Sequence, residues 1–294
     1  MASLSASELV VNPDGSIYHL NLRPEHLADW VITVGDPGRV GAVSRYFDSL
    51  EAQIQKREFV THTGRIGQKR VMVISTGIGP DNIDIVLNEL DALANIDLER
   101  RELLPRQRRL NFVRLGTSGS LQEDLPVDAF VFSAFGVGLD NLMAYYPFAP
   151  DAEELALLAG LQAQADETGV SWPVRPYAVR ADTALLEGLS GADRTGVTLT
   201  APGFYGPQGR NLRLAGAFGA DGLLRLAGYR HGALAITNLE METSALYGLA
   251  KLLGHGALSC NVILAGRTAG QFSPDPYAAV DRLIRTVLER IAAF

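Results

Sequence analysis

The chain has 294 residues, of which 47% are hydrophobic and 20% charged, a composition typical of a globular protein with a large buried core. Its formal net charge of −7 argues against a general nucleic-acid binder, although a local cluster of arginines could still bind a small anion. The chain has one cysteine, Cys260, so no disulfide within the chain is expected. The N-terminus does not resemble a signal peptide, and no apolar run reaches about 18 residues. We therefore expect a cytoplasmic protein without a membrane span.

Apolar runs rich in valine, isoleucine and phenylalanine alternate with helical spacing along the chain. Strands are expected in the short apolar runs that open three glycine-rich segments (31–40, 71–82 and 111–120), and again at 128–137, 195–200, 233–238 and 256–266. Helical spacing is expected after the first two glycine segments, at 151–168 and at the C-terminus. The apolar positions of the first expected helix are Val40, Val43, Phe47 and Leu50, and those of the second are Ile83, Val86, Leu87, Leu90 and Ala94. Those of the C-terminal helix are Val280, Leu283, Ile284, Val287, Leu288 and Ile291.

This alternation predicts a single α/β domain over residues 1–294, with three α/β/α layers and a central mixed sheet. No serine- or glycine-rich linker divides the chain. The segment 98–110 carries five arginines around a proline and no aromatic residue. We therefore expect a solvated surface insertion there rather than a nucleic-acid patch.

The three glycine-rich segments predict an anion site. Each is expected to turn at the carboxyl end of a strand, where ligands collect in α/β sheets. Gly35 leaves its backbone open to an oxyanion, and Arg39 follows one turn into the next helix. Arg114 and Thr117 add a guanidinium group and a hydroxyl. One glycine turn alone is often only a tight connection, but the three together favour phosphate.

Two further segments carry polar side chains suited to a sugar and a base. Glu240 and Glu242 stand at the start of a helical pattern, either as capping and surface charge or as acceptors for vicinal sugar hydroxyls. The loop FYGPQGR (204–210) presents Gln208 and Arg210 beside a Gly-Pro turn. An amide with a donor and an acceptor face, next to a guanidinium group, complements an imide edge such as that of uracil.

These segments stand in the order found in the first family of nucleoside phosphorylases, the PNP/UDP phosphorylase family, which the chain resembles over most of its length. The resemblance runs from YHLNL (18–22) to AGRT (265–268), through GDPGRV, KREF, STGIG, RLGTSG, FYGPQGR and NLEMET. It implies the family's α/β/α fold and the phosphorolysis of a nucleoside. Uridine is the expected substrate, giving uracil and ribose 1-phosphate in pyrimidine salvage.

The resemblance also implies a role for individual residues. Phosphate would be bound by Gly35, Arg39, Arg114 and Thr117, and by Arg57 of a neighbouring subunit. The base would contact Phe204, Gln208 and Arg210, and the ribose would contact Glu240, Met241, Glu242 and His19, the last from the adjacent protomer. Arg114, Glu242 and Arg210 are the expected catalytic residues. The resemblance further implies phosphate as co-substrate without another cofactor, a dimer-based hexamer, and a K⁺ ion at the dimer contact near Glu58 and Ser75.

Two departures bear on the substrate. The base loop has Gly206-Pro207 where uridine-cleaving members have the reverse order, and Gly266 replaces an asparagine before Arg267. The segment ILAGRTAG lacks the aspartate that purine-specific relatives place near the last strand, which favours a pyrimidine. A purine nucleoside phosphorylase, a hydrolytic nucleosidase and a non-catalytic nucleoside-binding relative remain the alternatives.

Overall fold

The apolar runs before the three glycine-rich segments become neighbouring parallel strands. β1 (Trp30–Val34) lies between β4 (Lys69–Ser75) and β7 (Asn111–Ser120) and pairs in parallel with both. Parallel strands covered on both faces need apolar side chains at nearly every position, and all residues of β1 are buried. The carboxyl ends of β1 and β4 therefore lie together at one edge of the sheet.

The computed structural model describes residues 3–219 and 221–294, in which a mixed sheet of 12 strands runs in the order β11-β12-β10-β8-β13-β7-β1-β4-β3-β2, with β9 and β14 attached to β8 and β13. The other strands of this sheet are β2 (Ser49–Lys56), β3 (Phe59–Ile66), β8 (Phe130–Gly138), β9 (Tyr177–Arg180), β10 (Arg194–Thr200), β11 (Arg230–His231), β12 (Leu234–Glu240), β13 (Gly256–Gly266) and β14 (Gln271–Phe272). A separate pair is formed by β5 (Ile96–Asp97) and β6 (Glu102–Leu103).

The sheet also closes partly on itself. β7 pairs in parallel with β13 and, near its end, antiparallel with β12. The strands β7, β13, β8, β10 and β12 consequently form a ring, which the pattern of apolar residues did not predict. The ring brings the end of β12 beside the end of β7, two parts of the chain that are far apart in sequence.

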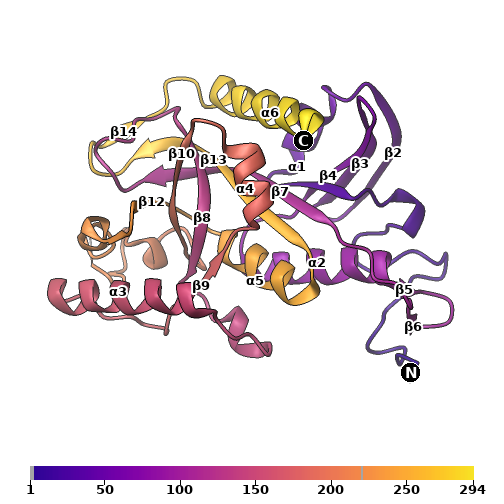
Figure 1. Cartoon of the computed structure of the whole chain (residues 1–294), viewed down its shortest axis with the longest axis horizontal. Coiled ribbons are helices and arrows are strands. Elements are labelled where there is room, and N and C mark those ends of the chain that lie inside the picture. The colour runs from indigo at the N-terminus through magenta and orange to yellow at the C-terminus, as the bar shows by residue number, and fades with distance from the viewer. Residues whose placement is uncertain (1–2, 220) are drawn as a thin grey trace.

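Helices cover both faces of the sheet. Helices α1, α4 and α6 lie on one side, and α2, α3 and α5 on the other (Figure 1). The helices are α1 (Pro37–Ser44), α2 (Pro80–Asn95), α3 (Ala152–Thr168), α4 (Thr183–Ser190), α5 (Thr243–Leu253) and α6 (Pro276–Ala293), with 3₁₀ turns η1 (Pro24–His26), η2 (Leu142–Tyr145), η3 (Gly206–Gln208) and η4 (Leu224–Gly228). The predicted three-layer fold is confirmed. Within the described ranges, no helix is both long and apolar enough to cross a membrane.

Most predicted elements agree with the structure to within a few residues, and two predictions are wrong. The third glycine-rich segment is not a turn, because residues 116–120 continue β7 and pair with β13. The helix after the first glycine segment ends at Ser44, so Phe47 and Leu50 lie outside it. Residues 49–56 pair with β3 instead, since sheet pairing outweighs the local spacing of apolar residues.

The arginines of segment 98–110 are mostly tied to the protein's own surface. Arg101 Nη1 donates to Leu9 O at 2.5 Å, Arg108 forms a 2.6 Å ion pair with Asp29, and Arg109 pairs with Asp182. These contacts fix the segment against the N-terminal residues and the start of α4. These contacts favour a location of segment 98–110 on the protein surface. That the segment is an insertion stays a prediction.

Candidate active site

A cavity of about 670 Å³ opens where the strands end, and we call it the active-site cavity. It is lined by Gly35, Asp36, Pro37, Arg39, Gly77, Ile78, Arg114, Thr117, Ser118, Gly119, Phe204, Gln208, Arg210, Leu239, Glu240, Met241, Glu242, Leu264, Ala265 and Phe272. The predicted phosphate, ribose and base residues of one protomer all lie in this set. Four predicted residues do not: His19, Arg57, Glu58 and Ser75.

The four residues predicted to bind phosphate, Gly35, Arg39, Arg114 and Thr117, line one part of the cavity, which we call the phosphate end. Asp36 caps α1 by accepting a hydrogen bond from Gly38 N at 2.8 Å, and this cap orients the turn that carries Arg39. Arg39 Nη1 donates to the carbonyl of Leu115 at 3.2 Å. Burial, and then the positive charge of Arg114, lower the pKa of Arg39. The positive charges of the two guanidinium groups thus repel each other, and an anion between them would relieve that repulsion.

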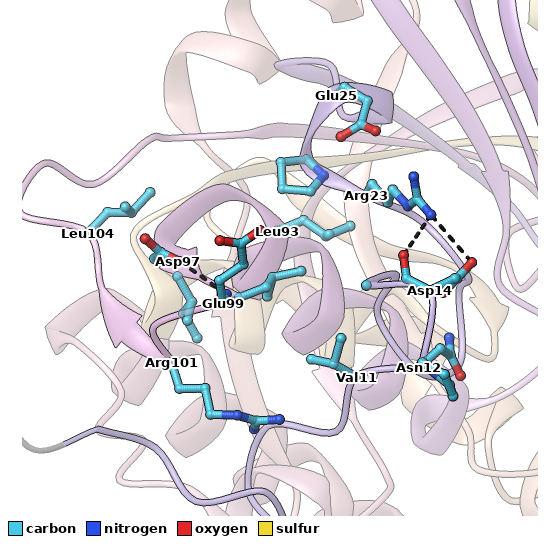
Figure 2. Close-up of a pocket in the computed structure, with 15 residues that line it drawn as sticks. Val11, Asn12, Asp14, Arg23, Glu25, Leu93, Asp97, Glu99, Arg101 and Leu104 are labelled. Carbon is cyan, nitrogen blue, oxygen red and sulfur yellow. Dashed lines mark hydrogen bonds and ion pairs between the residues drawn. The ribbon is translucent and has the colours of Figure 1, made fainter.

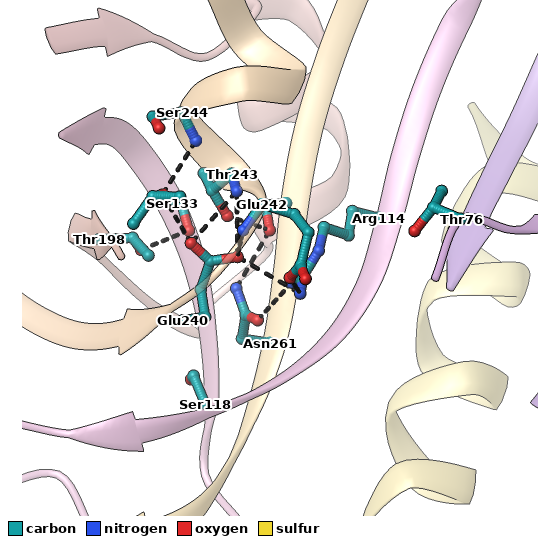
Figure 3. Close-up of polar contacts among 12 residues, drawn as sticks. Thr76, Arg114, Ser118, Ser133, Thr198, Glu240, Glu242, Thr243, Ser244 and Asn261 are labelled. Atoms are coloured by element: carbon teal, nitrogen blue, oxygen red, sulfur yellow. Dashed lines mark hydrogen bonds and ion pairs between the residues drawn. The ribbon is translucent and has the colours of Figure 1, made fainter. Parts of the chain in front are cut away.

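Arg114 projects from β7 into the buried interior, where it is only 6% exposed (Figure 3). Its Nη2 forms an ion pair with Glu242 and lies 3.3 Å from Glu240 Oε2, and its Nη1 donates to Asn261 Oδ1 at 2.9 Å. Burial alone would lower the pKa of Arg114, but the charges of Glu242 and Glu240 outweigh it and raise the pKa. Arg114 is therefore held charged at a fixed place on the cavity wall.

Glu240 and Glu242 have different partners. The Glu240 carboxylate accepts hydrogen bonds from Glu242 N at 2.9 Å, Thr243 N at 3.0 Å and Thr200 Oγ1 at 2.7 Å, so it caps the start of α5. Glu242 accepts from Gly79 N at 2.9 Å and from Arg114. Burial raises the pKa of Glu242, Arg114 opposes this, and Glu240 adds to it. Capping is therefore found at Glu240, whereas the expected surface charge is wrong because both carboxylates are buried. Glu242 lines the cavity, and its role as an acceptor for sugar hydroxyls stays a prediction.

The three residues predicted to contact the base, Phe204, Gln208 and Arg210, form another part of the lining, which we call the base end. Gln208 is buried on η3, and its Oε1 accepts a hydrogen bond from Arg210 Nη1. The Arg210 guanidinium also stacks on the Phe204 ring, 3.8 Å from its centroid. An amide oxygen has two lone pairs, so Gln208 can accept one more hydrogen bond while its NH₂ group donates. This is the donor and acceptor pattern that an imide edge requires.

The four predicted residues outside the cavity lie elsewhere on the chain. His19 is held by Glu89, whose carboxylate contacts His19 Nδ1 at 2.6 Å and accepts from His19 N at 2.9 Å. Arg57 lies in the turn between β2 and β3 with a φ of 55°. Ser75 Oγ donates to the carbonyl of Glu58 at 2.5 Å, which places those two residues side by side. Their predicted roles all require a second protomer or a cation, so they stay predictions.

Sequence reasoning assigned no role to two residues near the site. Arg267 Nη1 is buried without a hydrogen-bond partner among the described residues, and burial and the charge of Arg210 lower its pKa. Asn261 contacts Arg114 from the middle of β13. Each carried a usable signal: Arg267 directly follows a predicted strand, and Asn261 is an amide residue in the middle of a predicted buried strand.

A second cavity, of about 680 Å³, lies beside the N-terminal segment, the end of α2 and the β5–β6 pair (Figure 2). Its two arginines are engaged within the chain, since Arg23 Nη2 donates to Asp14 O at 2.6 Å and Arg101 to Leu9 O at 2.5 Å. None of the predicted site residues lines this cavity. We therefore place the chemistry in the active-site cavity.

The fold and the active-site cavity define an α/β protein whose cavity lining combines two arginines, Arg39 and Arg114, with the Glu242 carboxylate and the Gln208 amide. The chain belongs to the phosphorylase superfamily, whose model matches residues 29–293. It is a nucleoside phosphorylase and thus an enzyme of the pentosyltransferase class, as the order of its motifs predicted.

Three relatives illustrate the similarity. A uridine phosphorylase of Thermococcus kodakarensis is 26% identical over 261 residues, which cover 88% of this chain and 80% of the relative. A DeoD-type purine nucleoside phosphorylase of Bacillus velezensis is 28% identical over 248 residues, 82% of this chain and 84% of that protein. The crystal structure of a Trypanosoma brucei nucleoside phosphorylase, described as showing uridine phosphorylase activity, matches 97% of this chain and 100% of its own with 29% identity and a TM-score of 0.84.

Proposed function

We propose that the enzyme cleaves uridine with inorganic phosphate to give uracil and ribose 1-phosphate. The observation that carries this proposal is the pairing of two ends in one cavity. Arg39 and Arg114 both line the phosphate end, and Gln208 and Arg210 are hydrogen-bonded to each other at the base end. The uridine phosphorylase activity described for the Trypanosoma brucei relative supports uridine as the substrate.

In the reaction we propose, the bond between C1′ and N1 stretches first and leaves an oxocarbenium-like ribose. Phosphate, held by Arg39 and Arg114, then attacks the opposite face of C1′. The ionised Glu242 carboxylate accepts hydrogen bonds from the ribose hydroxyls and fixes the sugar between the two ends. Positioning of this kind can contribute up to about 7–11 kcal/mol, and it requires neither a covalent enzyme intermediate nor a metal ion.

The leaving uracil carries negative charge over its ring and carbonyl oxygens. Arg210 donates charge-assisted hydrogen bonds to that anion, and the Gln208 amide holds its imide edge. A purine would instead gain from a general acid at its imidazole nitrogen. The loop after β13, residues 267–270, contains no carboxylate that could serve as that acid. This difference favours the pyrimidine over the purine alternative.

We propose that the predicted residues outside the cavity act in the active site of a second subunit or at the contact between two subunits. Arg57 would reach the phosphate and His19 the ribose 5′-hydroxyl of an adjacent protomer, within a dimer-based hexamer. Glu58 and Ser75 would contact a K⁺ ion at the dimer contact. We further propose a cytoplasmic role in pyrimidine salvage, with phosphate as co-substrate and no other cofactor.

The test is the release of free base from uridine, thymidine, inosine and adenosine, each with and without phosphate. We expect uracil and ribose 1-phosphate from uridine only when phosphate is present. Free ribose without phosphate would identify a hydrolytic nucleosidase, and faster release of hypoxanthine or adenine would identify a purine enzyme. Heat of nucleoside binding by calorimetry without any product would identify a non-catalytic binder.

A further inference from the structure

Asn261 lies at the middle of β13 and is completely buried. It pairs in register with Gly116 of β7, which stands two residues beyond Arg114. Its Oδ1 accepts a hydrogen bond from Arg114 Nη1 at 2.9 Å (Figure 3). A buried amide next to a catalytic guanidinium group needs a reason, since an apolar residue would pack in a strand at lower desolvation cost.

The chemistry of the neighbours fixes how this amide points. Arginine has donors only, so the atom that faces Arg114 must be the amide oxygen. The amide nitrogen then donates to Ser259 Oγ at 3.1 Å, and Ser259 Oγ also accepts from Thr243 Oγ1 at 2.8 Å. Thr243 N in turn binds the Glu240 carboxylate at 3.0 Å. Asn261 is thereby held from behind by the start of α5, the same place that carries Glu242.

The contact between Arg114 and Asn261 has space because residue 116 is a glycine. A Cβ atom at position 116 would overlap Arg114 Nη1 and stand 2.5 Å from Asn261 Oδ1. The guanidinium–amide contact therefore occupies the volume that any other residue at 116 would fill. Arg114 reaches its position because β7 lacks a side chain there and β13 offers an acceptor.

The neutral charge of asparagine matters at this position. Arg114 already interacts with the carboxylates of Glu242 and Glu240. A third carboxylate would orient the guanidinium group equally well, but it would repel an incoming phosphate dianion. An amide oxygen accepts the same hydrogen bond and adds no charge.

We propose that Asn261 is a positioning residue for phosphate: a neutral acceptor that fixes the Arg114 guanidinium group without cancelling its charge. This inference rests on the proposed phosphorolysis, because it assigns Arg114 to the phosphate. The Asn261 side chain would therefore affect the affinity for phosphate and leave the contacts of the base end unchanged.

The experiment compares Asn261→Ala and Asn261→Asp with the wild-type enzyme by varying phosphate and uridine separately at several pH values. Asn261→Ala should raise the KM for phosphate roughly 10- to 100-fold, the effect of losing a hydrogen bond to a charged group, and change the KM for uridine much less. Asn261→Asp should also raise the KM for phosphate, and its ratio to the wild-type value should fall as the pH is lowered. A protonated aspartate again offers a neutral acceptor to Arg114 and a donor to Ser259.

Asn95→Ala is the matched control, because Asn95 is a buried asparagine of α2 that binds Asp91 and the Arg108 backbone and does not line the active-site cavity. It should lower thermal stability without changing either KM. An unchanged phosphate KM in Asn261→Ala, an equal loss in all kinetic constants, or an Asn261→Asp effect independent of pH would each overturn the inference. The wild-type enzyme, assayed over the same range of phosphate concentrations, separates failure of this inference from failure of the proposed function. If the proposed function is wrong, the wild-type enzyme will release the base at a rate that does not depend on phosphate.

Discussion

The two ends of the active-site cavity are built in different ways. At the phosphate end, Arg114 is buried in the sheet and is bonded to residues of β13 and the start of α5. At the base end, Arg210 and Phe204 lie on a short loop around η3, and Phe204 is 50% exposed. Residues that bind phosphate, the common reactant, can be fixed in the core. Residues that recognise one particular base lie on a surface loop, where the sequence can vary. The reaction class is therefore easier to infer than the substrate.

The largest effect should come from the buried end. Replacing Arg114 with alanine removes a charge from the phosphate and leaves two carboxylates unpaired, so we expect kcat/KM to fall on the order of 10³-fold. Thermal unfolding should show a loss of about 3–5 kcal/mol, the usual result of breaking a buried ion pair. Arg106→Ala, at an exposed position of segment 98–110, serves as the control. Kinetics within about tenfold of wild type, despite the lost stability, would remove Arg114 from the reaction.

The base end should respond more weakly and more selectively. Arg210→Ala should lower kcat/KM for uridine by about 10²-fold, because the leaving anion loses a charge-assisted hydrogen bond. The KM for phosphate should stay within a factor of about two, and steady-state kinetics with each substrate varied would measure both. Arg213→Ala, an exposed arginine on the following segment, is the control. Near-normal uridine turnover in Arg210→Ala would overturn the base-loop assignment.

A hybrid enzyme tests whether the phosphate end is completed across subunits. Arg57→Ala and Arg114→Ala subunits should each give nearly inactive homodimers. If Arg57 acts across the interface, one of the two sites in each hybrid dimer is intact, and co-expression at equal levels should restore roughly a quarter of the wild-type activity. The purified mixture, assayed beside the two parents, gives the answer. No recovery from two inactive parents would place Arg57 in its own protomer's site, and an active Arg57→Ala parent would place it outside any site.

The smallest predicted effect is a shift in pH dependence. Burial is the largest cause that raises the pKa of Glu242. Since only the ionised carboxylate is a pure acceptor, kcat/KM should fall as the pH drops through this raised pKa, at a higher pH than for an ordinary glutamate. Glu242→Gln should be less active at neutral pH and should lose this acid limb. An acid limb retained in Glu242→Gln would assign it to another group.

The sequence was informative wherever a signal is local. The strand before Gly35 and the helices at 80–95 and 276–293 follow from apolar spacing and glycine, and the order of motifs identified the family. Residues 116–120 were misread because their pairing with β13 lies far away in the chain. Asn261 was overlooked for the same reason, since its partner Arg114 is 147 positions distant.

The central claim is that phosphate is a reactant held between Arg39 and Arg114. A crystal structure of the enzyme grown in saturating phosphate tests it most directly. We predict tetrahedral density within hydrogen-bond distance of both guanidinium groups and of the Thr117 hydroxyl. Density that is absent from this place, with the two arginines turned toward bulk solvent, would contradict the account.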